Sequence, residues 1–261
     1  MEQDWKGTVC VVTGGAGGIG RCLAETFAAR GCAVAVMDQN RPLGEDLARR
    51  LGGECLFFCG DVGRQEDLEA FAGEVVRRWG AVDFLLNNAC LTRRGILSGC
   101  SWDDFNYVLR VGASAAYELC RLFRPYFQQG ASVVNITSTR DRMSQRDTES
   151  YTAAKGAISA LTRALAVSLG PAVRVNAIAP GWVDTGGWHG DEGYRPDYAD
   201  ADLQQHPSGR VGRPEDIARA ALFLCDGANS FITGQELTVD GGMTARMIYH
   251  GDEGWTLKGE R

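Results

Sequence analysis

Short continuous apolar segments alternate with helical patterns along most of the chain. The apolar segments cover residues 8–12, 33–37, 55–58, 82–86, 132–136, 173–178 and 236–239. Strands that are apolar throughout, rather than at every second residue, are typical of a parallel sheet buried on both faces. The alternation of strand and helix predicts βαβ units, and therefore an α/β fold: one doubly wound parallel sheet of about seven strands with helices on both faces.

Helical periodicity covers residues 21–30, 65–79, about 102–110, about 113–127, 151–169 and 214–225. No linker or repeat interrupts the alternation. Residues 1–248 are therefore predicted to form a single domain, and residues 249–261 a polar tail. The length of 261 residues is compatible with one α/β domain.

Charge and composition exclude several classes of protein. The chain has 27 basic and 33 acidic residues, a net charge of −6, which argues against a nucleic-acid partner. No apolar run approaches the roughly 20 residues of a membrane span, so no membrane partner is expected. The N-terminal residues also lack the apolar core of a secretion signal. Nine cysteines without a C-x-x-C pair, together with three histidines, predict reduced thiols in a cytoplasmic protein and no metal site.

A glycine-rich turn follows the first predicted strand and opens the first helix. Backbone N–H groups at such a helix start bind phosphate, and glycines let a pyrophosphate approach closely. A turn of this kind can also do no more than connect a strand to a helix. Asp38, at the end of the second strand, lies 18 residues after Gly20, near the spacing of a ribose-binding acid. Its carboxylate favours NAD over NADP, although it could instead be a solvated acid, and Arg41 leaves some use of NADP open.

Tyr151 and Lys155 are four residues apart in a predicted helix and therefore share one face. A lysine ammonium beside a tyrosine stabilises the phenolate, so such a pair can exchange a proton with an alcohol or carbonyl. A Tyr–Lys pair alone is more often an ordinary surface feature. Ser138, however, follows the carboxyl end of a predicted strand, where open α/β sheets bind ligands.

These motifs, in this order and spacing, resemble the short-chain dehydrogenase/reductase family over about residues 6–247. The matching segments are Thr13-Gly14-x-x-x-Gly18-x-Gly20, Asp61-Val62, Asn87-Asn88-Ala89, Ser138, Tyr151-x-x-x-Lys155, Asn176 with Pro180-Gly181, and Val239-Asp240-Gly241-Gly242. The resemblance implies a Rossmann-type fold and an oxidoreductase that transfers a hydride between NAD(H) and a small-molecule secondary alcohol or ketone, a reaction on a CH–OH group. The cofactor supplies the hydride, and the protein supplies orientation and proton transfer.

The resemblance also assigns roles to residues. It implies that Tyr151 is the acid/base, that Ser138 orients the substrate oxygen, and that Lys155 binds the nicotinamide ribose and tunes Tyr151. From the pyrophosphate to the adenosine and then the nicotinamide, the implied cofactor-binding residues are Gly14, Gly18, Ile19, Gly20, Asp38, Asp61, Val62, Asn88, Ala89, Tyr151, Lys155, Pro180, Gly181, Val183 and Thr185.

Two positions depart from the family pattern. Cys90 stands where a glycine is common, and Gly112 stands where an asparagine usually completes a catalytic tetrad. Water, Ser114 or another group could replace that asparagine, or turnover could be reduced. We expect an active enzyme with a Ser–Tyr–Lys triad. The alternative is a catalytically weak dinucleotide-binding sensor or scaffold. An epimerase or dehydratase is disfavoured because its long C-terminal domain is missing.

The substrate side is less constrained. In the family, the stretch after Pro180-Gly181 covers the substrate, so residues 182–209 are predicted to form a lid, and their glycines suggest mobility. The aromatic residues of this lid could bind a ring-shaped substrate or pack the lid onto the core. Arg140, Arg142 and Arg146 could favour an acidic substrate, but we favour solvated side chains.

The substrate candidates are 3-oxoacyl thioesters, hydroxysteroids, sugars and polyols, and the pattern decides neither the substrate nor the direction. The resemblance implies a homodimer or homotetramer formed through the helices near 113–127 and 151–169. Trp255 in the tail is predicted to dock on a neighbouring subunit or to close over a site.

Overall fold

The computed structural model describes residues 4–191 and 193–247; the predicted tail, with Trp255, lies outside them. In this part of the chain, seven strands form one parallel sheet in the order β3-β2-β1-β4-β5-β6-β7. The strands are β1 (Val9–Thr13), β2 (Ala33–Asp38), β3 (Cys55–Cys59), β4 (Val82–Asn87), β5 (Phe127–Ile136), β6 (Val173–Pro180) and β7 (Glu236–Val239). The prediction of one doubly wound α/β sheet is confirmed.

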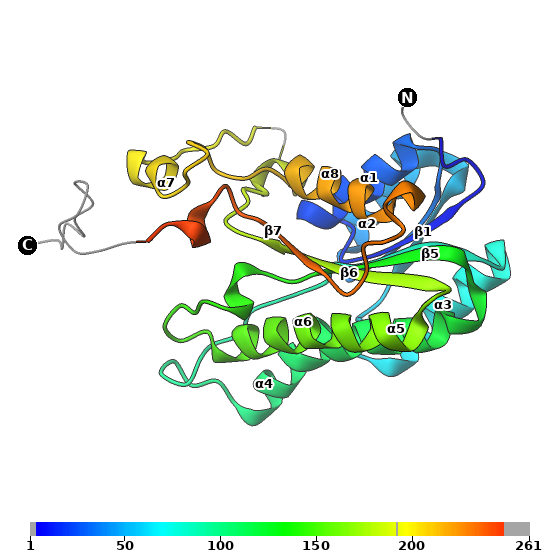
Figure 1. Cartoon of the computed structure of the whole chain (residues 1–261), viewed down its shortest axis with the longest axis horizontal. Coiled ribbons are helices and arrows are strands. Elements are labelled where there is room, and N and C mark those ends of the chain that lie inside the picture. Colours follow the sequence, from blue (N-terminus) through cyan, green and yellow to red (C-terminus); the bar gives the residue numbers. More distant parts are fainter. Residues whose placement is uncertain (1–3, 192, 248–261) are drawn as a thin grey trace, which may run out of the picture.

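Helices cover both faces of the sheet (Figure 1). One layer contains α1 (Gly18–Ala29), α2 (Arg41–Leu51) and α8 (Pro214–Cys225). The other contains α3 (Gln65–Trp79), α4 (Trp102–Leu109), α5 (Ala115–Phe123) and α6 (Glu149–Leu169). The short helix α7 (Asp200–Gln204) belongs to the predicted lid. None of the helices in the described ranges is both long and apolar enough to cross a bilayer.

Burial on both faces explains why the strands are apolar throughout. In β1, Val9 and Val11 pack with the core beneath α3, α5 and α6, while Cys10 and Val12 pack with the core beneath α1, α2 and α8. Successive side chains of a strand point to opposite faces, so a strand covered on both sides needs an apolar residue at every position. The two cores therefore share one sheet.

Two predicted helix boundaries are wrong, and one helix is missing from the prediction. The helix predicted for 113–127 ends at Phe123, because Pro125 falls in a tight turn at 124–126 and Phe127 already begins β5. Helix α2 was not predicted at all, since only Gly44 and Leu47 of its residues are buried. Helix α1 begins at Gly18, inside the glycine turn, rather than at Arg21.

The strand order places a crevice at the carboxyl ends of the central strands. The chain runs outward from β1 to β2 and β3, then returns to pair β4 on the other side of β1. Ligands bind at such a reversal, beyond the carboxyl ends of the strands. The ends of β1, β4, β5 and β6 lie side by side there, at Thr13, Asn87, Ile136 and Pro180.

Candidate active site

The glycine turn, residues 13–20, favours glycine at Gly14, Gly18 and Gly20 because of backbone conformation or lack of space. Gly14 and Gly18 have φ values of +62° and +56°, a conformation that favours glycine. A Cβ added at Gly20 would lie 2.1 Å from the carbonyl oxygen of Gly14. The missing side chains therefore let the backbone fold tightly before α1, whose first N–H groups are without partners inside the helix and suit a phosphate.

Hydrogen bonds from the end of β4 hold this turn in place. The Asn88 side chain donates from Nδ2 to the carbonyl oxygens of Thr13 and Gly14, at 3.0 and 3.1 Å. The backbone N–H groups of Asn88 and Ala89 both donate to Oγ1 of Thr13, which is buried. Asn88 and Ala89 thus fix the position of the first residues of the glycine turn, Thr13 and Gly14.

Asp38 and Asp61 lie at the predicted adenosine end. The Asp38 carboxylate accepts hydrogen bonds from the backbone N–H groups of Ala16, at 3.0 Å, and Asn40, at 2.8 Å. Arg41 instead pairs with Glu45 on the surface of α2. Asp61 accepts a hydrogen bond from the Tyr107 hydroxyl at 2.9 Å, and its neighbour Val62 is buried.

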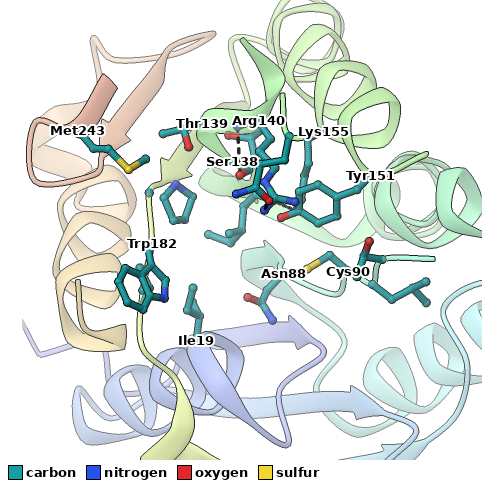
Figure 2. Close-up of a pocket in the computed structure, with 18 of the residues that line it drawn as sticks. Ile19, Asn88, Cys90, Ser138, Thr139, Arg140, Tyr151, Lys155, Trp182 and Met243 are labelled. Atoms are coloured by element: carbon teal, nitrogen blue, oxygen red, sulfur yellow. Dashed lines mark hydrogen bonds between the residues drawn. The ribbon is translucent and has the colours of Figure 1, made fainter. Parts of the chain in front are cut away.

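The three predicted catalytic residues converge at the end of β5 (Figure 2). Lys155 is 2% exposed, and its ammonium donates to the carbonyl oxygen of Ile136 at 2.7 Å. The same ammonium lies 5.5 Å from the centroid of the Tyr151 ring. Ser138 is buried, with Oγ accepting from the Arg140 N–H at 3.2 Å. The positive charge of Lys155 therefore lies next to the tyrosine that would carry a negative charge as a base.

These side chains line a cavity of about 710 Å³. Eight of the predicted site residues border it: Ile19, Asn88, Ser138, Tyr151, Lys155, Pro180, Gly181 and Val183. The other predicted residues lie outside its lining, in the floor of the turn, at the adenosine end or in the lid. Several lining residues carry no recognisable motif and were missed, namely Leu91, Thr92, Gln145, Asp202, Gln205 and Met243.

Gly112 is packed too closely to leave a vacancy for a side chain. It is buried in a π-helical turn, Arg110–Ser114, and a Cβ added there would lie 2.8 Å from Cβ of Ala154 on α6. Ser114, one possible substitute for the usual asparagine, is exposed and borders a separate hollow beside Val62 and Tyr117. Ser114 therefore does not reach the cavity.

The described part of the lid, residues 182–191 and 193–209, is tied together by its own side chains. The Asp184 carboxylate accepts hydrogen bonds from the hydroxyls of Tyr194 and Tyr198. Burial alone would raise the pKa of Asp184, but the Tyr198 hydroxyl and the Gly186 N–H outweigh it and hold the pKa below its ordinary value. Burial and the Asp184 carboxylate raise the pKa of Tyr198 to about 12. These tyrosines pack the lid, whereas Trp182 lines the cavity.

The lid also contacts the glycine turn. Nδ1 of His189 lies so close to Gly17 that a Cβ there would be 2.7 Å away. Nε2 of His189 is 3.3 Å from Oγ1 of Thr185, the residue expected at the nicotinamide. The sequence offers no signal for the contact between His189 and Gly17, which are far apart along the chain.

The three arginines after Ser138 have different surroundings. Arg142 pairs with Asp141 and Glu236, and Arg146 is exposed, as predicted. Arg140 is half-buried and lines the cavity, with its guanidinium 5.3 Å from the centroid of the Tyr151 ring; that its side chain is only solvated stays a prediction.

A family model described as enoyl-(acyl carrier protein) reductase matches residues 14–244. The chain belongs to the short-chain dehydrogenase/reductase family. Enzymes of this family are oxidoreductases that bind a nicotinamide dinucleotide and act on small molecules. The glycine turn, which excludes side chains at Gly14 and Gly20, fits that group. No three His, Cys, Asp or Glu side chains within 4–191 and 193–247 are grouped so as to hold a metal ion.

Individual relatives and a solved structure are also similar to this chain over most of its length. An uncharacterized oxidoreductase of Thermotoga maritima is 38% identical over 252 residues, covering 94% of this chain and 98% of the relative. The L-fucose dehydrogenase of Bos taurus is 34% identical over 254 residues, covering 93% of this chain and 91% of its own length. The solved structure of an apo SCOR enzyme from Clostridium thermocellum is 40% identical, covers 100% of both chains and has a TM-score of 0.88.

Proposed function

We propose that this protein is an NAD(H)-dependent dehydrogenase or reductase that interconverts a secondary alcohol and a ketone. The observation that carries the proposal is the meeting of Ser138, Tyr151 and Lys155 at one cavity above the glycine turn. Sugars and polyols are among the candidate substrates, supported by the similarity to an L-fucose dehydrogenase. Hydroxysteroids and 3-oxoacyl compounds remain candidates on the family pattern.

In the proposed mechanism the nicotinamide dinucleotide, which the glycine turn and the residues after β6 would hold, would supply or accept the hydride, and the side chains of this protein would move the proton. Tyr151 donates its hydroxyl proton to the ketone oxygen in reduction, or accepts the alcohol proton in oxidation. The Lys155 ammonium stabilises the phenolate in both directions. The Ser138 hydroxyl donates to the same substrate oxygen and orients it. Gly112 carries no side chain that could relay a proton, so Tyr151 would regain its proton from solvent after reduction and release it to solvent after oxidation.

We propose NAD rather than NADP as the cofactor because of Asp38. Its carboxylate already contacts the glycine turn at Ala16, so it lies at the place where the adenosine ribose would bind. A carboxylate there accepts hydrogen bonds from a ribose diol and repels a 2′-phosphate. Arg41, whose guanidinium pairs with Glu45, is engaged elsewhere.

The Tyr151→Phe variant tests the catalytic assignment. We expect kcat on a responsive ketone to fall by about 100- to 10,000-fold, the usual contribution of a general acid, while the Kd for NADH stays close to that of wild type. Tyr126→Phe, an exposed tyrosine just before the start of β5 and away from the site at that strand's end, is the matched control and should change neither value. The substrate comes from a panel of 3-oxoacyl thioester analogues, steroids, sugars and polyols.

The second candidate function, a dinucleotide-binding sensor or scaffold, is favoured by the packing at Gly112. Tight NADH binding by wild type without turnover on any member of the panel would establish it in place of the enzyme.

We also propose a homo-oligomer formed through α5 and α6, on which Tyr117 and Val167 are exposed apolar side chains. All nine cysteines fall within the described residues and are unpaired, which supports a reducing compartment such as the cytoplasm.

A further inference from the structure

Arg140 differs in its surroundings from the two arginines that follow it, Arg142 and Arg146. Within residues 4–191 and 193–247, no carboxylate forms an ion pair with its guanidinium, whereas Arg142 contacts both Asp141 and Glu236. Arg146 lies on the surface, but Arg140 borders the 710 Å³ cavity. A guanidinium facing a cavity without a counter-charge is ready to accept an anion from a ligand.

The position of Arg140 relates this charge to the reacting atoms. Its backbone N–H donates to Oγ of Ser138 at 3.2 Å, and its guanidinium lies 5.3 Å from the centroid of the Tyr151 ring. It also donates to Oε1 of Gln145, another residue of the cavity wall. Figure 2 shows Arg140 beside Ser138 and Tyr151, facing the same space. An anion bound there would lie next to the carbon whose oxygen contacts Ser138 and Tyr151.

The other charges of the cavity leave Arg140 as the available cation. Lys155 also lines the cavity, but it is buried and its ammonium donates to Ile136. The acid of the lining, Asp202, belongs to α7, where its carboxylate accepts from the Ala199 N–H at 2.9 Å. Arg140 extends from the turn after β5 instead, on the side of the catalytic serine.

We propose that Arg140 binds a carboxylate of the substrate, so that the substrate is an oxo acid or hydroxy acid, sugar acids included. Its carboxylate would lie within a bond or two of the reacting carbon. This inference rests on the proposed oxidoreductase function and narrows its substrate class. The planar guanidinium accommodates a carboxylate through two parallel hydrogen bonds, which a lysine cannot reproduce.

The test compares matched acids and esters. Activity with NADH is measured for 2-oxobutanoate and 3-oxobutanoate, each beside its methyl ester, in wild type, Arg140→Gln, Arg140→Lys and Arg146→Gln. For the better acid, Arg140→Gln should lower the ratio of kcat/KM for acid over ester by about 10- to 100-fold, as for a lost charged hydrogen bond. The ratio for Arg140→Lys should lie between those of wild type and Arg140→Gln, and Arg146→Gln should leave the wild-type ratio unchanged.

A second measurement separates this inference from the proposed function. The same acids and esters are titrated calorimetrically into the NADH complex of Tyr151→Phe, with and without Arg140→Gln. Preferential binding of an acid that disappears with Arg140→Gln supports the subsite even if wild type turns over no ketone of the panel, a result that would contradict the proposed function alone. If Arg140→Gln weakened the binding of acid and ester equally, or left their ratio of kcat/KM unchanged, the inference would be overturned and Arg140 would be assigned to packing against Tyr151.

Discussion

The glycine turn and the lid face the same crevice but are held in place by different means. The turn is held by backbone hydrogen bonds, by the buried Thr13 and by Asn88, and it excludes side chains. The lid is held by hydrogen bonds between side chains, chiefly those that Asp184 accepts from Tyr194 and Tyr198, and substitutions can change these side chains. A site built this way can keep one cofactor while its substrate specificity changes.

The largest expected effect comes from adding one methyl group to the turn. Gly20→Ala places Cβ 2.1 Å from the Gly14 carbonyl oxygen, so the turn must shift. We expect a loss of about 1–3 kcal/mol in the free energy of unfolding, as for an overpacked core, and a rise in the Kd for NADH of roughly 100-fold or more as the phosphate site is displaced. Urea unfolding and NADH fluorescence titration measure these two quantities.

Gly187→Ala is the matched change in the lid. The nearest atom to its added Cβ is Cδ1 of Tyr194 at 3.6 Å, an ordinary contact. We expect the free energy of unfolding to change by no more than about 0.5 kcal/mol and the Kd for NADH to stay the same. If the two alanine variants behaved alike, the contrast between turn and lid would be wrong.

The same contrast explains what sequence could predict. The positions of Gly14, Gly18 and Gly20 follow from backbone requirements that act within eight residues, so the pattern alone locates the turn. The Tyr151–Lys155 pair follows likewise from helical spacing. The π-helical turn and the packing of Gly112 against Ala154 depend on how two helices meet, and no local pattern encodes that.

The lid and the cavity wall depend on contacts without a period. Asp184 meets Tyr194 and Tyr198 through a loop, and His189 reaches Gly17 from a distant part of the chain. The surroundings of Arg140 could not be predicted for a related reason: whether an arginine has an acidic partner depends on which carboxylates the fold brings near. Sequence alone places three arginines in one segment but does not show that Glu236 on β7 pairs with Arg142.

A smaller effect is expected from cutting the central tie of the lid. Asp184→Asn removes the charge that accepts from Tyr194 and Tyr198, and hydrogen bonds to a charged group are stronger than those between neutral groups. We expect kcat/KM for the ketone substrate to fall about tenfold, because the lid closes less often over the cavity. Asp191→Asn, an exposed acid in the same segment that accepts from the Gly193 N–H, is the control. Equal losses in the two variants would show that Asp184 does not organise the lid.

The smallest expected effect concerns the ion pair just after the lid. Two nitrogens of Arg210 donate to the two carboxylate oxygens of Asp216, at 2.7 and 2.8 Å, and the Arg213 N–H donates to the same group. The hydrogen bonds from Arg210 lower the pKa of Asp216 to about 2. An unfolded aspartate has a pKa of about 3.9, so the native state favours the ionised form. This stabilisation is fully present above about pH 5 and is lost as the pH falls through 4 toward 2.

Because Arg210 is half exposed, solvent screening reduces the stabilisation to about 1 kcal/mol. Asp216→Asn should therefore lower the free energy of unfolding by about that amount at pH 6.5, and the difference from wild type should shrink by pH 3. Urea unfolding at the two pH values measures it, with Glu45→Gln, which removes the exposed partner of Arg41, as a control within about 0.5 kcal/mol. A difference independent of pH would mean that Asp216 acts as a neutral cap of α8. The segment after the lid would then be held, like the turn, by hydrogen bonds that do not titrate.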